Sequence, residues 1–185
     1  MGYEWTAGST VLRLVVGAAR LDARAYAAIA ADRAMGVAAV LVVALSAIAH
    51  AVTGVIFALE GGWAPIRSIV PAAVSQVVIW LVMSVVAFGV GRALGGQGTL
   101  GGILRSVGVA SLAALLYVFG WFPPVLVVML FYWLATTFVA IRGALALDAG
   151  RAAVALIVAA VIGVLVTQMG TLLVLDLLAA AGYPG

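Results

Sequence analysis

The sequence contains no cysteine and no lysine, and charged residues make up only 8% of its 185 positions. Without cysteine, disulfides, thiolate metal sites, iron–sulfur clusters and cysteine nucleophiles are excluded. Because all nine basic residues are arginine, Schiff-base chemistry and a P-loop lysine are excluded too. Hydrophobic residues, in contrast, make up 67% of the chain, against about 45–50% in a soluble domain. A chain this short cannot bury such an excess in a soluble core, so the composition predicts an integral membrane protein.

Charged residues separate long uncharged runs that are suited to crossing a bilayer. Three of these runs, 34–59, 68–91 and 152–175, have the length of one helical span, which needs about 20 apolar residues. The predicted fold class is therefore all-α, a polytopic membrane helical bundle.

The fourth run, 106–141, is too long for one span and contains two successive prolines, Pro123 and Pro124, near its middle. Proline lacks the backbone donor that a helix interior needs, so we expect a tight helical hairpin whose first arm begins near Leu100. The chain then has five transmembrane helices. The predicted parts are a cytoplasmic segment 1–33, a transmembrane domain 34–176 with spans at about 34–59, 68–91, 100–120, 123–141 and 152–175, and a short external tail 177–185.

The arginines indicate the orientation of the spans, because cytoplasmic loops are enriched in basic residues. With five spans and a cytoplasmic N-terminus, only Arg67 lies outside, whereas a single span at 106–141 would place three arginines there. We therefore expect an external C-terminus. The eight arginines predicted inside are Arg13, Arg20, Arg24, Arg33, Arg92, Arg105, Arg142 and Arg151. The aromatic residues predicted at the outer boundaries, where an interfacial belt belongs, are Trp63, Trp121, Phe122 and Tyr183.

The composition also indicates a source and a location. Alanine, glycine, valine and arginine dominate while lysine is missing, which suggests a GC-rich bacterial genome and hence the bacterial inner membrane. No cleavable signal peptide is expected, because the first apolar stretch, Val11–Ala19, is interrupted by Arg13.

Residues 9–32 have the pattern of one amphipathic helix on the cytoplasmic surface of the membrane. At 100° per residue, Arg13, Arg20 and Arg24 share a face. Apolar residues lie opposite them, and Asp22 falls in the middle of this apolar face. We expect Asp22 to accept a hydrogen bond or to pair with an arginine of a cytoplasmic loop. The segment as a whole is predicted to lie on the membrane surface.

The segment Gly96–Gly101 matches the dinucleotide-binding pattern G-x-G-x-x-G. That pattern requires a preceding strand and an acidic residue about 20 positions further on, but a membrane span precedes it and no acid occurs between Glu60 and Asp148. We therefore expect no nucleotide binding and a flexible cytoplasmic loop. The residues assigned to this loop and its exit are Gly95, Gly96, Gly98 and Arg105.

His50 is the only histidine and lies within the first predicted span, one helical turn from Ser46 and from Gly54. Ionisable residues inside a membrane are candidates for function. The simpler interpretation is a neutral histidine that is hydrogen-bonded across the bundle. The alternative is an axial ligand to a tetrapyrrole, either haem or a chlorophyll-type pigment. Apart from that alternative, no cofactor and no metal are expected.

Small residues recur at every fourth position along the last span. Such a ladder lets two helices approach closely in a membrane, so we predict a helix contact there. The sequence does not decide whether the partner helix is internal or belongs to another protein. The ladder consists of Ala155, Ala159, Gly163, Thr167 and Thr171.

The sequence favours no enzyme. Intramembrane aspartyl proteolysis needs two facing carboxylates, but Glu60 and Asp176 are the acids in or beside spans and both lie at predicted outer ends. No serine-hydrolase motif accompanies His50, and no charge is predicted at the midplane of a span, as transport usually requires. Three functions remain: a scaffold or accessory subunit of a membrane complex, a small transporter or channel component, and a tetrapyrrole-contacting subunit. The expected partners are the lipid bilayer and other membrane proteins, without nucleic acid or nucleotide.

Over residues 12–175 the layout resembles the Yip family (Ypt/Rab-GTPase-interacting proteins), in particular its bacterial branch. The most distinctive match is the glycine-rich segment Leu94–Leu100 followed by Leu104–Ala110, which places an arginine and a glycine at the start of the third span. Four weaker matches are Leu21-Asp22, Ala30-Ala31-Asp32, Ile141–Leu145 and Gly150–Ala152. The family often has proline after each of these aspartates, where this chain has Ala23 and Arg33.

The resemblance implies a five-span helical bundle with a cytoplasmic N-terminus. Eukaryotic members of the family bind Rab-type GTPases through a segment that carries an Asp-Leu-Tyr-Gly-Pro signature. That signature is absent here, so the GTPase role is not carried over. Bacterial members have no assigned reaction, which fits a non-enzymatic membrane protein.

Overall fold

The computed structural model describes residues 7–62 and 64–183, and every element in this part of the chain is helical. Five helical segments in it are long and apolar enough to cross a bilayer, with α5 and η1 together forming one of them. The predicted all-α bundle of five transmembrane helices is confirmed. The elements are α1 (Ala7–Ala19), α2 (Ala23–Ala31), α3 (Met35–Gly61), α4 (Ile66–Ala93), α5 (Leu100–Ala110), the 3₁₀ helix η1 (Ser111–Phe119), α6 (Pro123–Leu145) and α7 (Ala149–Ala180).

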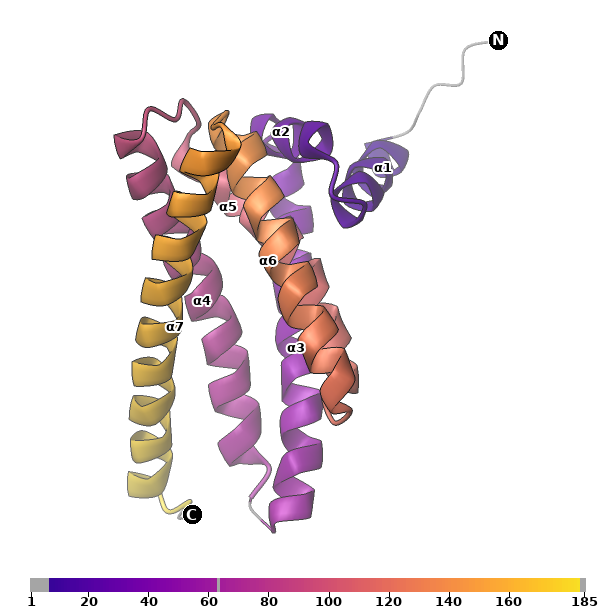
Figure 1. Ribbon diagram of the computed structural model, residues 1–185. Coiled ribbons are helices and arrows are strands. Elements are labelled where there is room, and N and C mark those ends of the chain that lie inside the picture. The colour runs from indigo at the N-terminus through magenta and orange to yellow at the C-terminus, as the bar shows by residue number, and fades with distance from the viewer. Residues whose placement is uncertain (1–6, 63, 184–185) are drawn as a thin grey trace.

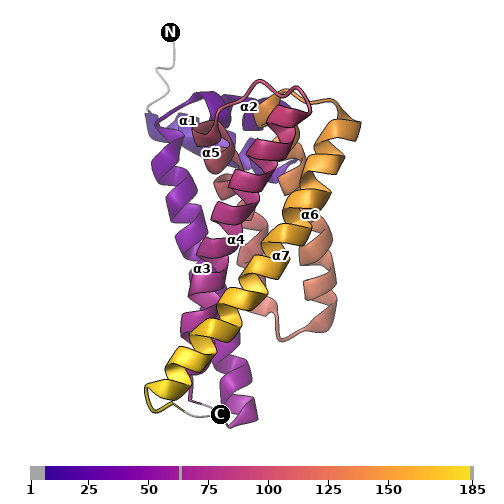
Figure 2. The ribbon, with the colours of Figure 1, turned by 90° about the vertical axis from the view of Figure 1, so that its left-hand side faces the viewer.

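The two ends of the bundle differ. In both views α1 and α2 lie across one end, beside the α4–α5 and α6–α7 connections, while the C-terminus and the junction of α3 with α4 lie at the other (Figures 1 and 2). The first end carries all the arginines except Arg67, so we call it the arginine end and the other the far end. At the far end, the Arg67 guanidinium donates a hydrogen bond to the Tyr183 carbonyl (3.0 Å).

The third and fourth spans form the hairpin that the two prolines predict. Phe122 has an extended backbone (φ −105°, ψ 104°), as the residue before a proline prefers. Pro123 occupies the first position of α6, where its missing donor costs nothing. The turn residues Trp121 and Phe122 are exposed, whereas Trp63 lies outside the described residues. The hairpin stops short of the far ends of α3 and α7 (Figures 1 and 2).

The second half of the third span has 3₁₀ rather than α-helical geometry. The segment η1 runs over Ser111–Phe119, although 3₁₀ runs longer than about four residues are uncommon. A 3₁₀ helix rises about 2.0 Å per residue against 1.5 Å in an α-helix. The hairpin therefore reaches further from the arginine end than an α-helix of the same length would.

The N-terminal segment forms two helices where the sequence predicts one helix over 9–32. The chain turns at Leu21, which has a positive φ of 60°, and α2 begins after Asp22. The Asp22 carboxylate accepts a hydrogen bond from the Arg24 backbone N–H (2.8 Å), because aspartate is among the strongest helix N-caps. The prediction that Asp22 lies in the apolar face of one long helix is therefore wrong. Asp22 does accept a hydrogen bond, as one of the two predicted alternatives has it, and the donor is the Arg24 backbone N–H.

The apolar face of α2 packs against the protein and not against lipid. Tyr26 and Ile29 are fully buried, in a cluster with residues of the bundle that includes Met35, Val109 and Ala140. The phenol oxygen of Tyr26 has no hydrogen-bond partner among the described residues. Burial raises the pKa of Tyr26 well above its usual value, and neighbouring Tyr132 raises it further. This phenol is therefore neutral at physiological pH, and α2 is an integral layer of the arginine end.

Candidate functional site

The glycine-rich connection between α4 and α5 is held firmly at the arginine end. The backbone N–H of Gly96 donates to Gly91 O (2.8 Å), and that of Gln97 donates to Leu145 O of α6 (3.0 Å). A Cβ placed at Gly98 would lie only 2.1 Å from Ala144 O, so no larger residue fits there without moving backbone. The prediction of a flexible loop is therefore wrong, because these close backbone contacts fix the segment on α6.

The backbone hydrogen bonds of this connection indicate whether its G-x-G-x-x-G pattern could bind a nucleotide. A phosphate-binding loop works because several backbone N–H groups point at the ligand. Here the N–H groups of Gly95, Gly96 and Gln97 all donate to carbonyls of the protein itself. This geometry supports the prediction that no nucleotide binds, which stays a prediction.

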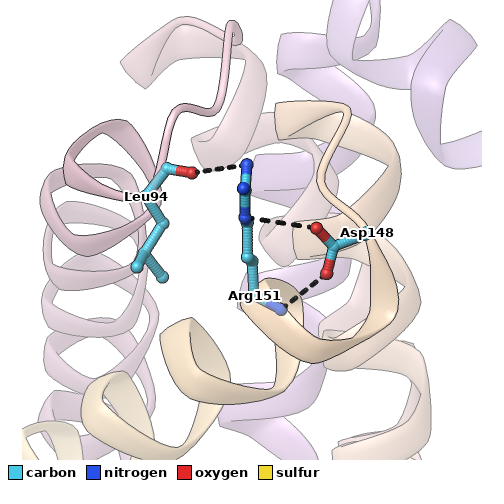
Figure 3. A network of polar contacts seen from close by, with 3 residues as sticks. All are labelled: Leu94, Asp148 and Arg151. Atoms are coloured by element: carbon cyan, nitrogen blue, oxygen red, sulfur yellow. Dashed lines mark hydrogen bonds and ion pairs between the residues drawn. The ribbon is translucent and has the colours of Figure 1, made fainter.

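A small polar network joins this connection to the start of α7 (Figure 3). The Arg151 guanidinium donates to Leu94 O (3.1 Å) and pairs with the Asp148 carboxylate (3.2 Å). The same carboxylate accepts from the Arg151 backbone N–H (2.9 Å) and so caps α7. Both charged side chains are more than half exposed, and exposed pairs contribute at most about 1 kcal/mol. The network positions the two loops without adding much stability.

Arg105 fastens α2 to the bundle. Its guanidinium donates to the carbonyls of Ile29 (3.3 Å) and Ala30 in the last turn of α2, where a helix exposes unpaired carbonyls and the negative end of its dipole. The neighbouring Ser106 hydroxyl donates to Tyr26 O (3.1 Å). Arg105 therefore has its polar partners within the protein.

Gly108, which follows Arg105 in α5, allows α5 to lie close to α3. A Cβ at Gly108 would lie 2.8 Å from the Cβ of Ala39 and 3.1 Å from Nε1 of Trp80. That Trp80 nitrogen donates to Leu104 O (2.9 Å), which ties α4 to α5. The arginine and glycine that carry the family resemblance are thus both packing elements of the arginine end.

The small-residue ladder on α7 packs against α4. Ala155 and Ala159 are fully buried in a cluster that also contains Met83. A Cβ at Gly163 would lie 3.1 Å from the sulfur of Met83. Further along, Thr171 and Ser75 of α4 share a hydrogen bond (2.9 Å). Thr167 lies between these contacts, half-buried. The sequence left the partner of this ladder open, and the structure places an internal helix against it.

His50 contacts its own helix and the hairpin. Its Nδ1 lies 2.9 Å from Ser46 O one turn earlier. A carbonyl can only accept, so Nδ1 is the protonated nitrogen and Nε2 of the neutral ring keeps its lone pair. The imidazole stacks on the Tyr117 ring, with centroids 3.8 Å apart and planes at 20°. The predicted hydrogen bond across the bundle is not found among the described residues, because the hydrogen bond of His50 stays within α3 and its contact across the bundle is the ring stack. Tetrapyrrole binding stays a prediction, which visible absorbance of the purified protein would test.

A cavity of about 300 Å³ lies beside this stack, between the spans. Every transmembrane segment contributes to its wall, and no charged side chain is among the described lining residues. Within the described part of the chain, no group of three His, Asp or Glu side chains could hold a metal ion. The lining residues are His50, Ser75, Gln76, Ile79, Ala114, Tyr117, Met129, Trp133, Val164, Thr167, Gln168 and Thr171.

The glutamines of this cavity were missed by the sequence analysis. Gln76 and Gln168 are uncharged, so the spacing of charged residues gave no reason to single them out. Both lie within long uncharged runs, and an amide in a span is a weaker form of the signal that His50 gives. Only the fold brings them together with His50.

Comparison with known families gives one match. The family model described as the Yip1 domain matches residues 22–170, a region that begins at the Asp22 cap and ends within α7. No curated protein and no solved structure matches the chain significantly. Because the family match covers most of the chain and the five-span bundle agrees with it, this protein belongs to the Yip1 domain family of membrane proteins.

Proposed function

We propose that this protein acts without catalysis, as a scaffold that holds or stabilises other components of the bacterial inner membrane, for example as an accessory subunit of a larger complex. The observation that carries the proposal is the use of charge at the arginine end. The guanidiniums of Arg92, Arg105 and Arg151 each donate to a backbone carbonyl of a neighbouring segment. These charges fix helix ends and loops in place instead of converging on a substrate.

Such an arrangement suits a structural role. A rigid end presents α1 and the two loops in one fixed geometry, which lowers the entropic cost of binding a partner. Leu12 on α1 is 65% exposed and lines one surface hollow with Arg13 and Arg20, so this surface offers both apolar and cationic contacts. The small-residue ladder of α7 already packs on α4, so a partner would meet other faces of the bundle.

Site-specific photo-crosslinking in the membranes of the native host tests this proposal. A photoreactive residue would replace Leu12 on α1, Val37 on α3 or Met169 on α7, all of which are exposed. We expect a discrete protein adduct from at least one position, and a different pattern from the others. Adducts to lipid alone at all three positions would contradict a scaffolding role.

The same proposal includes an orientation, with the N-terminus cytoplasmic and the C-terminus external. It is supported by the placement of all arginines but Arg67 on the arginine end, which is the distribution of cytoplasmic ends. A reporter fused after Tyr183 should be active only on the external side of the membrane. Cytoplasmic activity of that reporter would reverse the assignment.

A further inference from the structure

The cavity between the spans contains polar groups that the protein leaves unsatisfied. Gln76 is 5% exposed and makes no hydrogen bond with any described residue, although its amide can both donate and accept. The Oγ1 of Thr167, on α7, also has no partner among these residues, but this atom is itself covered by the protein. Leaving a buried amide or hydroxyl unpaired costs roughly 1–3 kcal/mol. Because the Gln76 amide lines the cavity, an occupant of the cavity can supply its partners.

The Ser75 and Thr171 hydroxyls beside the cavity are already engaged. Thr171 donates to Thr167 O (3.0 Å), so Ser75 is the donor in the hydrogen bond that the two hydroxyls share. Gln168, like Gln76, makes no hydrogen bond with the described residues, and it is exposed. The groups available to an occupant are therefore the amides of Gln76 and Gln168, the Tyr117 hydroxyl, the Trp133 indole N–H and the His50 Nε2, all neutral.

The lining restricts the charge of the occupant. An ion buried without a counter-charge is strongly disfavoured inside a membrane, and no charged side chain is among the described lining residues. Ile79, Met129 and Trp133 supply apolar wall. The cavity thus matches an uncharged group that carries both a donor and acceptors beside apolar atoms.

The position of the cavity indicates access from the lipid. Val164 and Gln168 of α7 belong to the lining and are also exposed, so the cavity reaches the surface along this helix. Figure 1 shows α6 and α7 close together at the arginine end and diverging toward the far end. A volume of about 300 Å³ is at the lower limit for small-molecule sites. It therefore suits a head group whose chains remain in the bilayer.

We propose that this cavity binds the head of a neutral glycerolipid, in which a free hydroxyl donates and ester carbonyls accept, with the acyl chains leaving past α7. The Gln76 amide pairs with the glycerol ester region, and Gln168 closes the rim. The site is independent of the scaffolding role and would operate with or without a protein partner.

Photolabelling of the full chain in phosphatidylcholine vesicles tests this proposal. The probe is a photoreactive diacylglycerol, and a photoreactive phosphatidylglycerol with the same chains serves as the charged counterpart. We expect the diacylglycerol to label peptides of α4 or α7 that line the cavity. In Gln76→Met, which keeps the shape and removes the amide, this labelling should fall about fivefold, as the loss of one hydrogen bond predicts.

Two further variants separate this site from unspecific lipid contact. Gln97→Met makes the same change on the exposed connection at the arginine end and should leave labelling unchanged. Thr167→Val removes a hydroxyl whose oxygen is covered by the protein and should leave diacylglycerol labelling unchanged as well. Labelling by phosphatidylglycerol should not respond to either cavity variant. Equal diacylglycerol labelling of wild type and Gln76→Met would mean that the Gln76 amide does not bind the lipid, and would overturn the proposal.

Thermal unfolding in detergent shows whether a variant loses labelling because its fold is destabilised. Because Gln76 has no partner within the described protein, Gln76→Met should unfold at the same temperature as wild type or a higher one. If Gln76 instead stabilised the fold, Gln76→Met would unfold at a lower temperature than wild type. A lower unfolding temperature together with weaker labelling would make Gln76 a packing residue and would overturn its role in binding.

Discussion

The arginine end and the cavity use their polar groups in opposite ways. At the arginine end, Arg105, Arg151 and the backbone of Gly96–Gln97 all find partners within the protein. Around the cavity, Gln76 and the Thr167 hydroxyl find none among the described residues. One region therefore fixes the relative positions of the helices, and the other is left with capacity to bind. Variants that disturb only one of the two regions test this difference.

The largest effect is expected from Gly98→Ala at the arginine end. The added Cβ would lie 2.1 Å from Ala144 O, and a backbone atom at the end of α6 cannot move aside as a side chain can. We expect a loss of about 3 kcal/mol in stability, measured by thermal unfolding in detergent. Gly89→Ala is the control, because a Cβ there meets nothing within 4 Å. Equal unfolding temperatures for Gly98→Ala and wild type would mean that the connection is not held on α6.

A smaller loss, about 2 kcal/mol, is expected from Gly163→Leu in the ladder. Its new side chain meets the flexible Met83 side chain rather than backbone, so part of the strain can relax. The variant should still insert into the membrane, because leucine favours insertion. Leu165→Ala, at a position that is 60% exposed, should change the unfolding temperature much less. A Gly163→Leu protein that melts normally but loses a co-purifying partner would place the main contact of this face outside the chain.

Arg105→Met should cost about 1.5 kcal/mol, because the last carbonyls of α2 lose charged donors. The change is local, so limited trypsin digestion is the sensitive measurement. Cleavage after Arg33, just beyond α2, should become faster than in wild type. Unchanged digestion would show that Arg105 does not fasten α2.

The smallest effect is expected from Arg151→Met, at most about 1 kcal/mol, because its pair with Asp148 is exposed. Moderate salt should weaken the wild-type contribution further, since exposed charges are screened. Unfolding temperatures at low and high salt, compared between wild type and variant, provide the measurement. A larger loss than for Arg105→Met would invert the order that burial predicts.

The sequence was sufficient for those features that depend on local chemistry. The spacing of charged residues located the spans, and Pro123 located the hairpin, because both act through the residues themselves. The one local feature that was misjudged is the N-terminal helix. Its 3.6-residue pattern continues across Asp22, but an N-cap that bonds the Arg24 backbone is a stronger signal than periodicity.

Features that depend on contacts between segments far apart in the sequence could not be predicted in the same way. Gly98 is indistinguishable from a loop glycine until Ala144 is known to lie against it. Gln76 and Thr167 are far apart in the chain and acquire meaning only when α4 and α7 face one cavity. The 3₁₀ geometry of η1 likewise has no clear signature in its composition.

The contrast between a closed region and an open cavity is tested most directly by thiol accessibility, because the protein has no cysteine of its own. Ser75→Cys and Ser84→Cys make the same change on α4. Ser75 lines the cavity, whereas Ser84 is completely buried nearer the arginine end. In vesicles, neutral N-ethylmaleimide should modify Ser75→Cys readily and Ser84→Cys very slowly, since reactivity requires access. Equal rates at the two positions, or no reaction at Ser75→Cys, would contradict an open cavity between the spans.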